Sequence, residues 1–155
     1  KNALLWHKQV FESCKLLEQV EVSLSINKEN SIVKSILESG NYLNLRHLSF
    51  NYCTLDVVEI CELVSKAKNL EMLGLFRPYA DNDPRKHFSY NNQVATPDCE
   101  SLAKEVIKAI AGTNYHCGEY PSLCLYGRDF HDSASIEQFV KDNYPEIRLY
   151  IQEYA

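Results

Sequence analysis

Residues 45–53 read Leu-Arg-His-Leu-Ser-Phe-Asn-Tyr-Cys, and this stretch decides the fold that the rest of the chain follows. In an extended chain, alternate side chains fall on one face. Leu48 and Phe50 therefore point one way, while His47 and Asn51 point the other way. The pattern predicts a β-strand with one apolar face and one polar face.

An apolar-periodic helix is predicted to follow this strand. It is expected to begin at Thr54, a good N-cap residue, with Asp56 in the first turn, where a carboxylate suits the helix dipole. Its apolar stripe recurs at helical spacing and comprises Val57, Val58, Cys61, Val64 and Ala67. The strand frame then begins again at residues 70–75. A unit with one apolar strand face and one apolar helix stripe needs neighbours stacked on both sides.

The same strand frame occurs at several other places in the chain, which indicates internal repetition. Its copies begin at residues 17, 45, 70, 120 and 146, so the spacings are 28, 25, 50 and 26 residues. No copy lies near residue 95. The spacing of 50 is therefore interpreted as one unit that carries a long insertion.

This pattern resembles the leucine-rich repeat family, and the spacing of 25–28 residues with helical connectors is similar to its ribonuclease-inhibitor-like branch. The resemblance covers residues 13–151, and Cys53 matches the Asn or Cys that the family places ninth in the frame. The unit at 70–75 departs from the family by having Pro78 at that place. The resemblance implies an α/β solenoid, with parallel strands on the concave side and helices on the convex side.

The resemblance also implies a role in protein recognition. Related repeats occur in F-box substrate receptors of ubiquitin ligases and in nucleotide-binding receptors of innate immunity. The sequence contains no F-box-like or nucleotide-binding segment, so it favours neither host. We expect one domain over residues 1–155, as a fragment or terminal part of a longer array.

Composition narrows the classes of partner. The chain is 45% hydrophobic and carries a net charge of −5, which argues against nucleic acid as the main partner. No run approaches the roughly 18 apolar residues that a membrane span needs, so no membrane partner is expected. The six cysteines show no C-x-x-C spacing and are interpreted as reduced thiols in a cytoplasmic or nuclear protein.

The predicted insertion spans residues 76–95. It has no apolar period, but it contains aromatic side chains and several basic ones in an otherwise acidic chain. Long loops of this kind inside compact domains are usually functional or disordered. Because aromatic and Arg residues are favoured at interface hot spots, the insertion is a candidate contact for a partner, with a tolerated surface loop as the alternative.

The outward strand positions and the strand-to-helix loops together form the predicted protein-binding surface. Repeat proteins of this kind bind their partners through the concave face that their strands form. Large side chains on a face that meets water favour such a role. The predicted partner-binding residues are His47, Asn51, Tyr52, Met72, Phe76, Arg77, Tyr79, Arg85, Lys86, Phe88, Tyr126, Arg128, Phe130 and Tyr150.

Two further interpretations stay open. The chain can be a small open-sheet α/β enzyme with helices on both faces and a site at the carboxyl edge of the strands. That site would comprise Tyr52, Arg77, Arg128, Asp129 and His131. The chain can also be a structural piece whose exposed faces bind further repeats of the same chain. No motif places a nucleophile, a phosphate loop or a metal-ligand set, so the sequence predicts no catalytic residue, metal or cofactor.

Overall fold

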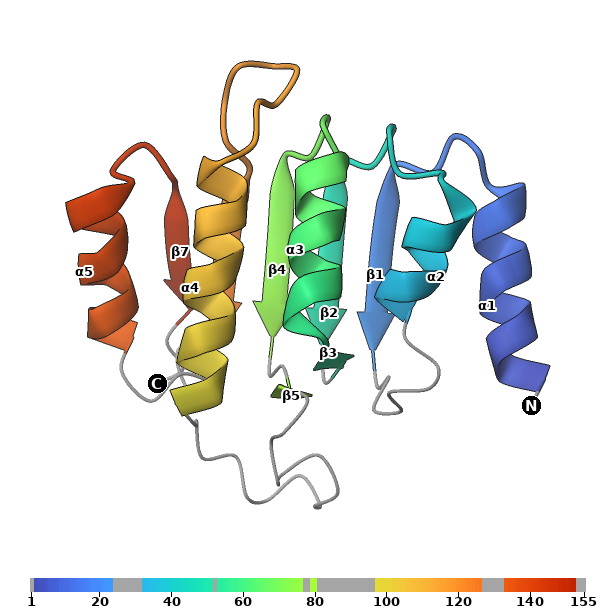
Figure 1. The fold of residues 1–155 in the computed structure, drawn as a ribbon, viewed down its shortest axis with the longest axis horizontal. Coiled ribbons are helices and arrows are strands. Elements are labelled where there is room, and N and C mark those ends of the chain that lie inside the picture. The colour runs from blue at the N-terminus through green and yellow to red at the C-terminus, as the bar shows by residue number, and fades with distance from the viewer. Residues whose placement is uncertain are drawn as a thin grey trace.

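The computed structural model describes residues 2–23, 32–51, 53–76, 79–80, 97–126 and 133–152. Helices and strands alternate along these residues (Figure 1). The elements are α1 Asn2–Ser13, β1 Gln19–Ser23, α2 Ile32–Ser39, β2 His47–Asn51, β3 Thr54–Leu55, α3 Val57–Lys66, β4 Met72–Phe76, β5 Tyr79–Ala80, α4 Pro97–Ala111, β6 Ser122–Tyr126, α5 Ser133–Asn143 and β7 Leu149–Gln152.

The five longer strands form one open, parallel sheet in the order β1-β2-β4-β6-β7. Each strand therefore pairs with the next one along the chain. The register follows the spacings predicted from the sequence, because Gln19 aligns with His47, His47 with Met72, and Met72 with Ser122. The short strands β3 and β5 continue the same register beyond β2 and β4, since Thr54 aligns with Tyr79.

One face of this sheet carries the core. Two apolar rows run across it in register, and the six residues of these rows on β2, β4 and β6 are buried. The first row is Val20, Leu48, Leu73, Leu123 and Leu149, and the second is Val22, Phe50, Leu75, Leu125 and Ile151. The strand frame of the sequence is thus confirmed as the sheet's contribution to the core.

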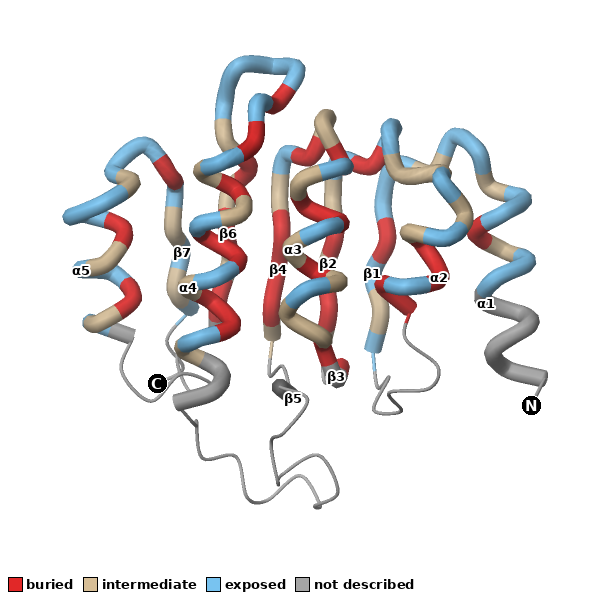
Figure 2. The backbone as a smooth tube through the Cα atoms, viewed as in Figure 1, coloured by how far each residue is buried: buried red, intermediate tan, exposed pale blue. Residues whose placement is uncertain are grey.

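The helices lie in a single layer over that apolar face, in front of the sheet in Figure 1. Neighbouring helices pack against each other in chain order, from α1 to α5. Their inner stripes are buried and their outer sides are exposed (Figure 2). The row of helices extends beyond the sheet at both ends of the molecule (Figure 1).

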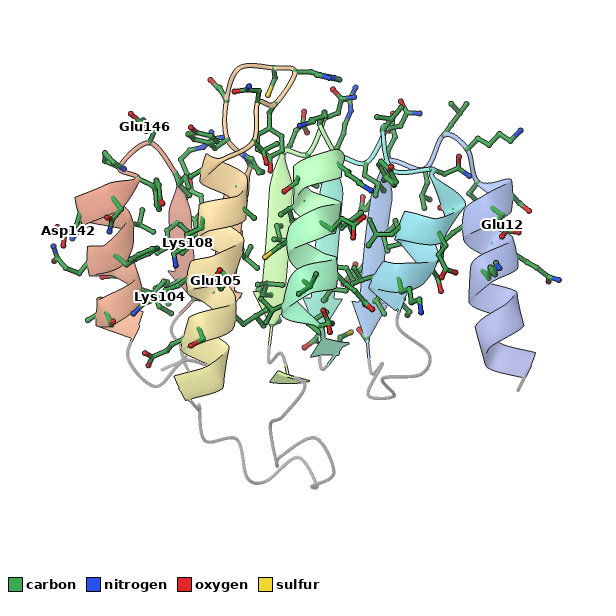
Figure 3. The ribbon with its side chains drawn as sticks, in the orientation of Figure 1. Glu12, Lys104, Glu105, Lys108, Asp142 and Glu146 are labelled. Carbon is green, nitrogen blue, oxygen red and sulfur yellow. The ribbon has the colours of Figure 1, made fainter. Side chains whose placement is uncertain are left out.

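Side chains also join the helices. Lys104 and Glu105 are labelled on α4 in Figure 3. Lys104 donates to Ser135 Oγ over 3.1 Å, and its Nζ lies 5.8 Å from the centre of the Phe139 ring. This cation–aromatic contact ties α4 to α5.

Hydrogen bonds recur from one unit to the next. The carbonyl of Glu18 accepts from the backbone N–H groups of Arg46 and His47, and the carbonyl of Arg46 accepts from Glu71 and Met72 in the same way. Two side chains before the strands repeat as well. Asn44 donates to the carbonyl of Lys15 over 3.4 Å, and Asn69 donates to the carbonyl of Leu43 over 2.7 Å. Repetition therefore extends from the sequence to the bonds that join consecutive units.

Two predictions for α3 are wrong. The helix does not begin at Thr54, because Thr54 pairs in β3 and Asp56 is the N-cap, accepting from the Glu59 N–H over 3.0 Å. Val58 does not belong to the buried stripe, since its exposed fraction is 74%. Ile60 and Leu63 complete the buried side instead.

Candidate functional site

The face of the sheet opposite the helices is the main candidate site, and we call it the open face. Its side chains occupy the alternate strand positions and are mostly exposed or half-buried. The register sorts them into three rows. The first row is Gln19, His47, Met72 and Ser122, the second is Glu21, Ser49, Gly74, Cys124 and Tyr150, and the third is Ser23, Asn51 and Phe76.

The middle row of the open face forms a shallow depression at its centre, because Ser49, Gly74 and Cys124 have small side chains. The ring of Phe76 occupies this space and lies over Gly74. A Cβ atom built on Gly74 would stand 2.6 Å from Cε2 of Phe76 and 3.2 Å from Oγ of Ser49. Real Cβ atoms do not come this close to a ring carbon, so the position of the ring requires glycine at residue 74.

The residues around Phe76 give the open face a mixed character. Met72 is half-buried, and Tyr150 has an exposed fraction of 56%. His47 Nε2 lies 3.5 Å from the Glu71 carboxylate, a pair that is charged at both ends only when the imidazole is protonated. Partial burial raises the pKa of the Cys124 thiol, so this cysteine stays a neutral, weakly polar part of the face.

A hollow of about 520 Å³ lies where strands β6 and β7 begin. It is lined by Thr113, Asn114, Tyr115, Gly118, Glu119, Tyr120, Glu146 and Arg148. Glu146, labelled in Figure 3, lies in the turn between α5 and β7. Residues 113–119 belong to the link between α4 and β6. No local pattern signals the hollow, because it forms only when residues 146–148 come to lie beside that link.

Several polar side chains of this hollow bond to one another or to nearby backbone carbonyls. Arg148 donates to the Tyr120 carbonyl over 3.3 Å, and its guanidinium lies 3.8 Å from the Glu119 carboxylate. Tyr115 donates its hydroxyl to the Val64 carbonyl over 2.8 Å, and burial raises the pKa of that hydroxyl well above its usual range. The Tyr115 hydroxyl thus fixes the link to α3 of the helix layer. The hydrogen bonds that the structure gives to the side chains lining the hollow do not pair a nucleophile with a base.

The structure brings together the predicted partner-binding residues that it describes. His47, Asn51, Met72, Phe76 and Tyr150 all lie on the open face. The other predicted contacts are outside the described side chains, although Tyr79 and Tyr126 belong to β5 and β6. They are Tyr52, Arg77, Tyr79, Arg85, Lys86, Phe88, Tyr126, Arg128 and Phe130. The residues of the alternative enzyme site, with Asp129 and His131, also lie outside the described part.

Metal sites, membrane spans and disulfides are absent from the part of the chain that the structure describes. No group of three metal-ligating side chains occurs there. None of the helices it describes is long and apolar enough to cross a membrane. No disulfide forms among Cys14, Cys53, Cys61, Cys117 and Cys124.

Comparison of the chain with protein-family profiles, with curated proteins and with solved structures finds no significant match. The candidate site therefore stands on the residues and the geometry of this chain.

Proposed function

We propose that the chain is a recognition module of leucine-rich-repeat type that binds a protein partner through its open face. One observation carries the proposal. A parallel sheet normally has both faces covered, whereas the described helices cover only one face of this sheet (Figure 1). The uncovered face presents the Phe76 ring over the middle row, which also carries Tyr150, and Met72 lies in the first row.

The repeat geometry supports this proposal. Strands lie about 4.8 Å apart in a sheet, but packed helices need about 8–10 Å. A stack with one strand and one helix per unit therefore curves, with the strands on the inside. The row of helices that extends beyond the sheet in Figure 1 agrees with such a curve. A concave open face surrounds a partner with several strands at once.

The chemistry of the open face favours a protein over other partners. Its centre is aromatic and sulfur-containing, and the first and third rows supply amides, a histidine and serines. This combination of an apolar centre and a polar surround is the usual anatomy of protein interfaces. We include the predicted insertion at residues 76–95 in the proposed surface, because its first residue, Phe76, belongs to β4 and to the open face.

Site-specific photo-crosslinking tests the proposal. A photo-reactive amino acid at Tyr150 probes the open face, and one at Val58 is the matched control on the exposed side of α3. We expect a discrete protein adduct from cell extract at residue 150, its loss when Phe76→Ala is added, and no such adduct at residue 58. Equal adducts at both positions, or an adduct at 150 that ignores Phe76→Ala, would count against the open face.

The contribution of the insertion is tested separately. Replacing residues 81–93 by a short Gly/Ser linker removes the predicted contacts Arg85, Lys86 and Phe88 while leaving the strands β4 and β5 in place. Folding is checked by circular dichroism. We expect the adduct at residue 150 to weaken if the insertion contacts the partner. An unchanged adduct would limit the binding surface to the strands.

A further inference from the structure

The two end strands differ from the inner ones in how well the core covers them. Leu48, Leu73 and Leu123 of the inner strands are fully buried. In contrast, the core-facing side chains of β7, Leu149 and Ile151, are only half-buried, as is Val22 of β1. In Figure 2, β4 is largely red, whereas β7 carries no buried residue. The core is therefore open at both ends of the sheet.

Both end strands also carry an unpaired backbone edge among the described strands. The Glu18 carbonyl bonds toward β2, so the alternation of a strand directs the backbone groups of Gln19, Glu21 and Ser23 outward. The Arg148 carbonyl bonds toward β6, so Leu149 and Ile151 direct theirs outward on the other side. Edges of this kind are templates for a further strand.

The two ends complement each other because they belong to one repeating arrangement. A strand placed beside β1 must be parallel and must continue both apolar rows, and β7 has these properties. With the rows kept in line, Tyr150 aligns with Glu21. The Glu21 N–H then donates to the Leu149 carbonyl, in the way that the His47 N–H donates to the Glu18 carbonyl within the chain.

We propose that β7 of one copy pairs with β1 of a second copy, so that the chain associates head to tail. Leu149 and Ile151 of one copy then meet Val20 and Val22 of the other in continuous apolar rows. In the helix layer, α5 of the first copy packs beside α1 of the second, as α4 packs beside α5 within one copy. The interface joins two different surfaces, so each added copy again presents a β1 edge and a β7 edge, and association continues into rows or rings of molecules.

Two variants block the two edges. Glu21→Pro removes the outward N–H of β1 at a position whose side chain is exposed, and proline is tolerated on edge strands. Glu21→Ala is its matched control and keeps the N–H. Ile151→Lys places a charge in the apolar row at the β7 edge, where the long stem reaches solvent in the single copy. Ile151→Val is its control.

Sedimentation velocity of the full chain over a wide range of concentration is the test. We expect the mean mass to rise with concentration, and each blocking variant to weaken association by about tenfold or more while the controls do not. Mixing Glu21→Pro with Ile151→Lys leaves one intact edge on each partner, so the mixture should form dimers that do not grow further.

Several outcomes would overturn the proposal. One is a chain that stays monomeric at every concentration, as expected if further repeats of a longer polypeptide are the sole occupants of these edges. Another is a closed dimer that neither blocking variant affects. A third is a mixture that forms no dimer while circular dichroism shows both variants folded. The proposal that a partner binds the open face does not depend on any of these outcomes, so each proposal can fail while the other stands.

Discussion

The contact between Phe76 and Gly74 gives the sharpest prediction about the open face. A methyl group at residue 74 would meet Cε2 of the ring at 2.6 Å and Cζ at 3.1 Å, so Gly74→Ala must displace the ring. Both atoms are at the far end of the side chain, so the ring can rotate away. The Phe76 ring, which we propose contacts the partner, would then leave its place while strand β4 stays intact.

The energy of this change can be worked from two opposing terms. Alanine in a strand interior is favoured over glycine by about 0.5–1 kcal/mol, because it loses less backbone entropy. Phe76 is half-buried, and full burial of such a side chain is worth about 1.5–3 kcal/mol, so its displacement costs about 1 kcal/mol. Gly74→Ala alone should therefore leave the free energy of unfolding nearly unchanged. In a Phe76→Ala background, it should stabilise by about 0.5–1 kcal/mol.

A double-mutant cycle measured by urea denaturation checks this reasoning. The two substitutions should couple by about 1 kcal/mol, well above the roughly 0.5 kcal/mol within which independent sites add. Gly112→Ala is a matched control, because its Cβ makes only an ordinary contact of 3.4 Å with the Lys108 carbonyl. It should add independently to Phe76→Ala. If the effects of Gly74→Ala and Phe76→Ala on the free energy of unfolding were additive, the Phe76 ring would not lie over Gly74.

Three further predictions concern the scaffold and its thiols. Asn69→Ala removes a 2.7 Å bond to the Leu43 carbonyl and should cost about 1 kcal/mol in urea denaturation, whereas Asn44→Ala removes a 3.4 Å bond and should cost clearly less. Asp56→Ala removes the N-cap of α3 and should lower the free energy of unfolding by about 1 kcal/mol; no change would mean that the cap is dispensable. Burial, with smaller contributions from Glu105 and Asp56, raises the pKa of Cys61 to about 11. Because a raised pKa disfavours the reactive thiolate, iodoacetamide at mildly alkaline pH should label the exposed Cys117 well before Cys61 by mass spectrometry, and the reverse order would contradict this burial.

The sheet was predictable from the sequence because two independent periods agree. The alternation within residues 45–53 sets which side chains face the core, and the spacing between copies of the frame sets the register. The burial of Leu48 and Phe50 confirms the alternation, and the pairing of Gln19 with His47 and of His47 with Met72 confirms the register. The spacing of 50 residues likewise predicted that β6 pairs directly with β4.

The errors at the start of α3 have a physical cause. Thr54 is a good N-cap by its own chemistry, but it pairs with Tyr79 in a neighbouring unit, a contact that no local pattern contains. Asp56 then takes the capping role. Val58 was misplaced because α3 is apolar on more than one side, so helical spacing alone does not fix which stripe faces the sheet. The place of the Phe76 ring was equally hidden, because it depends on Ser49 and Gly74 in adjacent positions of the folded sheet.

One cause explains both the open face and the open ends. A repeat unit of this size buries only the apolar side of its strand, and each neighbour that it gains covers its flanks but never its outward face. Adding units thus lowers the share of strands that have an exposed edge while enlarging the open face. Association through β1 and β7 would extend the row that carries Phe76, so a partner bound there would contact more than one copy. Crosslinking from Tyr150, which lies on the last strand beside the proposed junction, should then depend on protein concentration, and Glu21→Pro should remove that dependence without removing the adduct.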